Sequence, residues 1–284
     1  MRGWWQDLTD LVLPADCAGC GAPRTALCPR CRGMLDGRRP RRARPEPEPA
    51  GLPVVHAVAP YAAEVRELLL AHKERGALAL AGPLGTALAG AVRAGLGADA
   101  GPGTGPGSVL LVPVPSARWA VRARGHDPVR RMALAAAGEL RRTGTPARVA
   151  SVLRQRRAVA DQAGLDARRR LANLGGALEV TAAGGRLLGA GRAVLVDDLM
   201  TTGATLAEAA RALREAAVSR PADRTVVYRA ITREGRGERL IGVRPQEREW
   251  MHDAPEKGAP NALGRMLHAA VIAAPRDSFE MNRN

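Results

Sequence analysis

The stretch "AVLVDDLMTTGATLAEAARAL", residues 193–213, decides the fold that the sequence predicts. It contains the aliphatic run Val194-Leu195-Val196, which is typical of a central strand in a parallel sheet. Asp197 and Asp198 follow at the carboxyl end of this run, and a helical pattern begins at Leu206. Ligands of open α/β sheets bind outside the carboxyl ends of the strands. The two carboxylates are therefore predicted to face a ligand.

The loop between the acids and the helix has the composition of a phosphate site. Backbone N–H groups, threonine hydroxyls and the positive end of a helix dipole all favour an anion there. The residues predicted to contact it are Thr201, Thr202, Gly203, Ala204 and Thr205. Carboxylates accept hydrogen bonds, so the two acids suit ribose hydroxyls or a metal ion. Phosphate on the helix and ribose on the acids together describe a phosphorylated ribose; the alternative is a capped strand–turn–helix with surface acids.

Strand and helix patterns alternate along the chain. This alternation predicts an α/β fold with a parallel, doubly wound sheet over residues 51–232. Residues 36–50, rich in Arg and Pro, are predicted to be a linker, and residues 233–284 a flexible tail. The predicted strands cover residues 54–62, 108–115, 191–198 and 225–231, and the predicted helices cover residues 64–76, 129–142 and 206–217.

All four cysteines lie within the first 35 residues, as two Cys-x-x-Cys pairs: Cys17 with Cys20, and Cys28 with Cys31. Four thiolates at this spacing suit tetrahedral zinc, and a closed shell of four leaves no place for a reacting water. The sequence therefore predicts a zinc ribbon over residues 1–35, with zinc in a structural role; the alternative is four unrelated thiols.

The formal net charge of +15 favours a polyanionic partner, although arginine is abundant along the whole chain of 284 residues. No run of 18 uninterrupted apolar residues is present, and the apolar stretch at 78–92 is predicted to be a core helix. The N-terminal residues lack a signal-peptide pattern, so we expect a cytoplasmic protein without a membrane span. The cysteines are then not expected to form structural disulfides.

Residues 193–205, "AVLVDDLMTTGAT", resemble the 5-phosphoribosyl-1-pyrophosphate (PRPP) motif of type I phosphoribosyltransferases. Together with the cysteine pairs, they make the chain similar to the ComF family, which joins a zinc ribbon to a phosphoribosyltransferase domain. The resemblance covers roughly residues 10–232 and includes four further segments in order. These are Lys73 with Gly76, Pro113-Val114-Pro115, Arg122 to Asp127, and Gln162, Leu165, Arg170 and Asn173.

The chain departs from the family pattern at two places. Glu74 stands where the family usually has an aromatic residue. His126-Asp127-Pro128 stands where it usually has an aromatic residue followed by Asn and Gln. Both departures concern the contacts of the second substrate more than the PRPP motif.

The resemblance implies an enzyme that binds PRPP with Mg²⁺ and transfers phosphoribose to an acceptor that the sequence does not identify. Asp197 and Asp198 would be catalytic residues that fix the sugar. Arg118 or Arg124, after the strand predicted at 108–115, would bind the pyrophosphate together with Mg²⁺; the alternative for either arginine is a solvated surface charge. Residues 158–170 would form a mobile flap, the alternative being an exposed helix.

The association of the family with DNA uptake implies a second candidate class: a non-catalytic protein that senses PRPP or handles single-stranded DNA. Its basic residues would be Arg38, Arg39, Arg41, Arg42 and Arg44, and its stacking residues Trp4, Trp5 and Trp119. The alternative for these arginines is a soluble linker.

Three further polar residues lie near the expected site. Lys73 is expected either to reach the site or to complement the dipole of its helix. His72 and His126 are expected to be ordinary polar positions.

Overall fold

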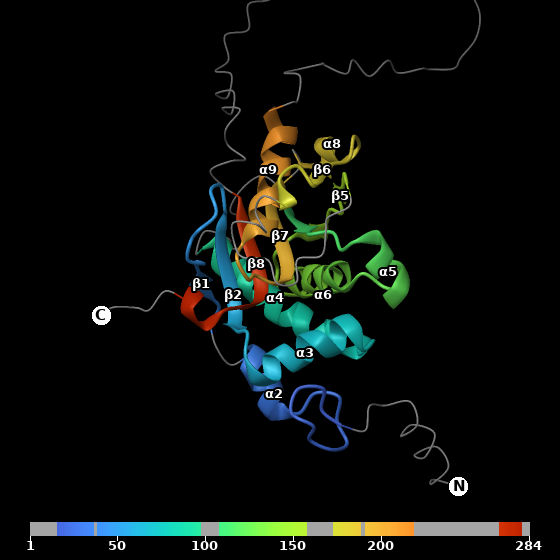
Figure 1. The fold of residues 1–284 in the computed structure, drawn as a ribbon. Helices are drawn as coiled ribbons and strands as arrows, with labels where there is room; N and C mark the ends of the chain where they lie inside the picture. The colour runs from blue at the N-terminus through green and yellow to red at the C-terminus, as the bar shows by residue number, and fades with distance from the viewer. Residues whose placement is uncertain are drawn as a thin grey trace, which may run out of the picture.

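The computed structural model describes residues 16–36, 39–97, 108–157, 173–188, 191–218 and 267–279. Its centre is a six-stranded sheet in the order β1-β2-β8-β7-β3-β4 (Figure 1). The strands are β1 (Arg41–Ala43), β2 (Val54–Pro60), β3 (Ser108–Pro113), β4 (Ala147–Val149), β7 (Gly191–Leu199) and β8 (His268–Ala274). All neighbours are parallel except the edge strand β1, which runs antiparallel to β2. The predicted α/β class with a mostly parallel sheet is confirmed.

Helices cover both faces of this sheet (Figure 1). On one face pack α3 (Ala63–Glu74), α4 (Ala81–Leu96) and α6 (Pro128–Arg142), and on the other packs α9 (Ala204–Val218). Successive residues of a strand point to opposite faces. Accordingly, Val194 and Val196 of β7 belong to the core below α4 and α6, whereas Leu195 belongs to the core below α9.

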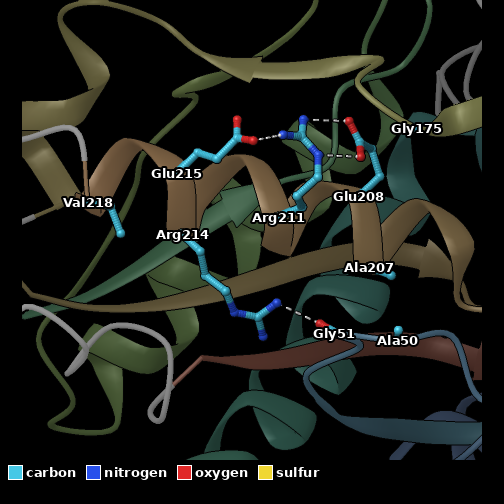
Figure 2. A pocket seen from close by; sticks show the side chains of 9 residues that line it. All are labelled: Ala50, Gly51, Gly175, Ala207, Glu208, Arg211, Arg214, Glu215 and Val218. Atoms are coloured by element: carbon cyan, nitrogen blue, oxygen red, sulfur yellow. Dashed lines mark hydrogen bonds and ion pairs between the residues drawn. The ribbon is translucent and has the colours of Figure 1, made fainter.

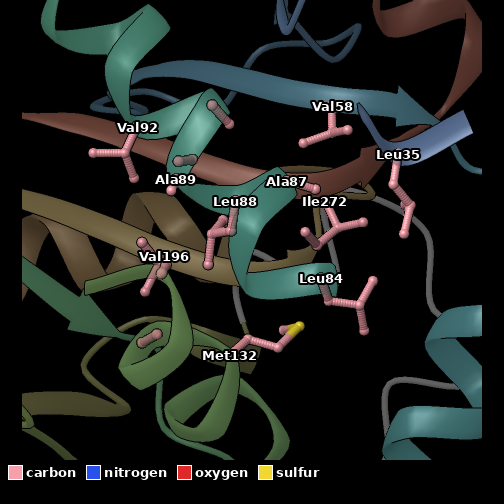
Figure 3. Close-up of a cluster of buried hydrophobic side chains, with 14 of the residues drawn as sticks. Leu35, Val58, Leu84, Ala87, Leu88, Ala89, Val92, Met132, Val196 and Ile272 are labelled. Carbon is pink, nitrogen blue, oxygen red and sulfur yellow. The ribbon is translucent and has the colours of Figure 1, made fainter. Parts of the chain in front are cut away.

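Helix α4 forms the middle of the first core (Figure 3). It follows the short 3₁₀ turn η1 (Leu78–Leu80) and packs against β2, β8 and α6. In the described part of the chain, Leu78–Leu96 is the one segment long and apolar enough to cross a membrane by length and composition. Half of it is buried inside the protein, which agrees with the predicted core helix.

The shorter elements surround the sheet. A two-stranded antiparallel sheet lies over the face that α9 covers, as its apolar residues join the same core. The strands of this small sheet are β5 (Leu153–Gln155) and β6 (Leu178–Val180). The other short elements are α2 (Pro29–Asp36), α5 (Arg118–Arg124), α8 (Gly184–Leu188) and the turn η3 (Arg276–Ser278).

Two expected boundaries differ from the structure. Residues 268–274, expected in a flexible tail, form β8 between β2 and β7 in the middle of the sheet. Residues 41–43, expected in a linker, form the edge strand β1. Strand β8 reads HAAVIAA and is buried on both faces, so it has no polar alternation, and its alanines have a low strand propensity.

Several predicted features lie outside the described residues. They include the strand at 225–231, the flap at 158–170 with Gln162, Leu165 and Arg170, and the side chains of Trp4, Trp5 and Arg38.

Candidate functional site

The acid pair lies at the carboxyl end of β7, the strand between β3 and β8. Both side chains are buried, with Asp197 9% and Asp198 6% exposed. Asp197 Oδ1 accepts a hydrogen bond of 2.8 Å from the backbone N–H of Asp198. Asp198 Oδ2 accepts one of 2.7 Å from Lys73 Nζ, across 125 residues of sequence. Lys73 therefore reaches the site, which was one of the two roles expected for it.

Burial and mutual repulsion set the charge of this site. Burial raises the pKa of Asp197 well above its ordinary value, and the neighbouring Asp198 charge raises it further. Burial alone would lower the pKa of Lys73, but the two carboxylates outweigh it, and the net pKa of Lys73 is raised. A buried acid pair favours ligands that donate hydrogen bonds or bring a cation.

The threonine loop joins the acid pair to α9, which begins at Ala204. Its side chains are accessible: Thr201 is exposed, and Thr202 and Thr205 are half-buried. The first N–H groups of any α-helix have no acceptor within the helix. Because α9 begins five residues after the end of β7, its first N–H groups lie at the same edge of the sheet as the two carboxylates. The predicted phosphate site needs this arrangement.

Gly203 shapes this loop. Its φ of +75° lies in the left-handed region, where a side chain is strained. A Cβ atom there would also lie 3.1 Å from Leu52 and 3.3 Å from the buried Pro45. The segment between β1 and β2 therefore packs directly on the predicted phosphate loop, a contact that the linker interpretation had missed.

The two predicted pyrophosphate arginines occupy different environments. Arg118 begins α5 and is exposed. The guanidinium of Arg124 donates to both carboxylate oxygens of Glu74, at 2.7 and 2.6 Å. Glu74 follows Lys73 in α3, so Arg124 pairs with a residue next to the one that contacts Asp198, whereas Arg118 is exposed.

Two histidines also join the end of α3 to the residues between α5 and α6. His72 is buried, and its Nε2 lies 3.3 Å from the carbonyl oxygen of Pro128. The ring of His126 lies 5.9 Å from the ring of His72, and its Nε2 lies 3.2 Å from the carbonyl oxygen of His72. Burial lowers the pKa of His72. Both contacts go to backbone atoms, as expected for ordinary polar positions.

Three successive residues of α3 thus contact other segments of the chain: His72 contacts His126, Lys73 contacts Asp198, and Glu74 contacts Arg124. The two departures from the ComF pattern, at Glu74 and at His126, both lie within these contacts. The sequence marked both segments but gave no sign that they meet.

The four cysteine sulfurs lie within 4.8 Å of one another. Zinc–sulfur bonds of about 2.3 Å would place tetrahedral sulfurs about 3.8 Å apart, so these side chains suit zinc. Burial raises the pKa of Cys17, but backbone N–H groups, first that of Cys28, lower it more, and the net pKa is about 6. A cluster able to bind a metal is therefore confirmed; zinc as its identity remains a proposal.

The cysteine cluster is not separate from the main core. Cys17, Cys28 and Cys31 are buried in the same cluster of apolar residues as Leu84 and Ile272. In Figure 3, Leu35 of α2 points to this core beside Val58. The predicted ribbon is thus a module seated on the α/β domain.

A hollow of about 530 Å³ lies along α9, beyond the threonine loop (Figure 2). Its charged groups already have partners. Arg211 pairs with Glu208 and Glu215, and Arg214 donates to the carbonyl oxygen of Gly51. We do not place the phosphoribosyl site here, because neither acid of the pair lines this hollow.

Comparison with protein-family models returns no match for this chain, and comparison with curated proteins returns none. The ComF resemblance therefore rests on the motifs in the sequence.

Proposed function

We propose that the chain is a ComF-like protein that binds PRPP and transfers its phosphoribose to an acceptor. The observation that carries this proposal is the buried acid pair, balanced by Lys73 and adjoining the start of α9. Asp197 and Asp198 would accept hydrogen bonds from the ribose hydroxyls. The N–H groups and hydroxyls of residues 201–205 would bind the 5-phosphate.

The transfer breaks the bond between the anomeric carbon and the pyrophosphate oxygen. The electron pair of that bond leaves with pyrophosphate, and a lone pair of the acceptor forms the new bond. By analogy with other glycosyl transfers, the transition state resembles an oxocarbenium ion. Buried carboxylates that hold the sugar also stabilise positive charge on its ring.

Magnesium, bound mainly by pyrophosphate oxygens and water, would neutralise charge on the leaving group. Arg124 would assist; its guanidinium pairs with Glu74, the residue after Lys73 in α3. An arginine offers two parallel donors to a phosphate.

We assign the metal cluster to zinc in a structural role and the protein to the cytoplasm. The physical support is the four thiols gathered within 4.8 Å, an arrangement that suits a metal in a reducing compartment.

Transfer is tested by release of pyrophosphate from PRPP and Mg²⁺ in the presence of a panel of nucleobases and amines. The proposal predicts release that needs one acceptor class and that Asp198→Asn lowers at least about 100-fold, the loss expected when a transition-state contact is removed. PRPP binding without any acceptor-dependent release would favour the sensing alternative.

A second candidate is binding of single-stranded DNA, favoured by the surface of α5. Trp119 is 74% exposed there, between the exposed side chains of Arg118 and Arg122. The arginine run itself is partly engaged: Arg41 lies over the ring of Phe279, and Arg44 pairs with Glu48. DNA binding would weaken with salt by roughly one power per phosphate contact, and Trp119→Ala would reduce it.

A further inference from the structure

Helix α3 has a different partner at each end. In its first turn, Glu64 accepts a hydrogen bond of 2.6 Å from Arg30 of α2, the helix that carries Cys31. In its last turn, Lys73 donates to Asp198 at 2.7 Å. Nine residues of helix, about 13 Å, separate the two contacts. One rigid element therefore joins the cysteine module to the acid pair.

The middle of α3 rests on the same module. Leu68 is fully buried, in one core with Cys31 and Leu35. The packing is tight, since a Cβ atom at Gly19 would lie 2.9 Å from Cys31 Sγ and 3.2 Å from Leu68 Cγ. Helix α3 packs mainly against α2 and the turn η1, and less against the strands. Helix α3 thus rests on both the cysteine module, through α2, and the turn η1.

We infer that the metal-bound cysteine module positions Lys73 on Asp198 through α3, with Leu68 as the positioning residue between them. A module of about twenty residues has no core of its own and packs on that of the α/β domain, so a bound metal supplies the remaining constraint on its fold. When the metal is lost, α3 loses its packing against α2, and Lys73 separates from Asp198. The inference rests on the proposed function only where it concerns ligand affinity.

The chain makes this testable without any ligand, because it has only two lysines, Lys73 and Lys257. An amine-acetylating reagent reacts with the free amine, so an ion-paired lysine is protected. Labelling of each lysine in the full chain, read by mass spectrometry, is compared before and after the metal is removed by a chelator under reducing conditions. The ratio of Lys73 to Lys257 should rise on the order of tenfold, the change for one pKa unit.

Asp198→Asn sets the upper reference, because it removes the charge that pairs with Lys73 in a metal-loaded protein. An unchanged labelling ratio in metal-free protein that still melts cooperatively would overturn the inference.

A pair of glycine variants tests the same link with the metal in place. In Gly19→Ala the added Cβ atom crowds both Cys31 Sγ and Leu68, whereas in Gly33→Ala, on α2, it meets nothing within 4 Å. Gly19→Ala should raise Lys73 labelling severalfold, and Gly33→Ala should leave it unchanged. If the metal-free chain unfolds completely, the comparison of these two metal-loaded variants still tests whether the cysteine module positions Lys73. Equal labelling in the two folded, metal-loaded variants would overturn the inference.

The affinity for ribose 5-phosphate shows whether the link between the cysteine module and Lys73 affects ligand binding. Coupled sites change each other's affinity by the same factor, typically about 5- to 150-fold. Ribose 5-phosphate should therefore bind more weakly to metal-free protein, and Lys73→Met should remove that difference. If the metal-loaded chain does not bind ribose 5-phosphate, the proposed function fails, while the labelling experiment still decides the link. Equal affinity with and without metal would overturn the link.

Discussion

Lys73 and Lys257 are the only lysines among 43 basic side chains, the rest being arginines. Arginine is the common cation of this chain, but the basic side chain that contacts Asp198 is the ammonium of Lys73. An ammonium is a compact point charge, whereas a guanidinium is a wide planar fork that binds a carboxylate through two bonds. A compact cation suits a site where ribose hydroxyls must also reach the carboxylate.

Lys73→Arg is therefore predicted to weaken PRPP binding about tenfold, equivalent to about 1.4 kcal/mol. Lys257→Arg, the same exchange at the other lysine, should leave the Kd unchanged. Titration calorimetry checks both variants. A Lys73→Arg protein that binds as tightly as the wild type would show that any cation serves there.

Asp197 also predicts a pH dependence of stability. A carboxyl whose pKa is raised by folding holds its proton more tightly in the folded state. Its contribution to stability is then greatest below the unfolded pKa of about 3.9, and is lost as the pH rises through the folded pKa. In Asp197→Asn no carboxyl ionises at this position, so the stability is not lost as the pH rises. The side-chain oxygen of the asparagine can still accept the hydrogen bond from the Asp198 N–H.

Asp197→Asn should therefore melt at a higher temperature than the wild type at pH 7, with the gap closing as the pH falls toward about 4. Melting curves over this range provide the measurement, and Asp277→Asn, at an exposed position, serves as the control. A gap that stays constant with pH would contradict the explanation.

Among the helices and strands, the sequence predicted best those whose apolar residues recur regularly and form a buried face. The helix predicted at 129–142 is α6, Pro128–Arg142, and that predicted at 206–217 is α9, Ala204–Val218. The acid pair and threonine loop were recognisable because strand, loop and helix are consecutive. Strand β8 was missed because its alanines carry little strand signal. The Lys73–Asp198 contact was left open because sequence spacing does not encode a pair 125 residues apart.

The contact between α4 and α6 depends on a small residue. A Cβ at Gly85 would lie 2.4 Å from Ala135 Cβ and 2.9 Å from the backbone nitrogen of Ala136. Gly85→Ala should therefore cost about 1–3 kcal/mol of unfolding free energy, the usual range for overpacking. Gly90→Ala, in the same helix with Pro40 at an ordinary 3.6 Å, should gain up to about 1 kcal/mol. Denaturant unfolding measures both, and changes of the same sign would contradict the packing.

At the scale of the whole molecule, the sheet is completed by a strand from the far end of the chain. β8 pairs with β2 on one side and β7 on the other, so the acid pair on β7 depends on residues 268–274. The cysteine module lies against the same core from the opposite end of the sequence. The cysteine cluster, α3, the acid pair and β8 thus form one connected structure.

A chain ending at residue 232 is predicted to lack a cooperative melting transition, because β2 and β7 would each lose a row of backbone hydrogen bonds. A chain ending at residue 279 keeps β8 and should melt like the full chain. Thermal unfolding followed by circular dichroism distinguishes them. A 232-residue chain that melts cooperatively at the wild-type temperature would contradict the central role of β8.

The central claim is that Asp197 and Asp198 bind a phosphoribosyl ligand, and calorimetry with PRPP and Mg²⁺ tests it most directly. The metal-loaded wild type should bind with a Kd in the micromolar range, Asp277→Asn should bind equally, and Asp197→Asn/Asp198→Asn should not bind. Absence of binding by a folded, metal-loaded wild-type protein, or equal binding by the double variant, would contradict it.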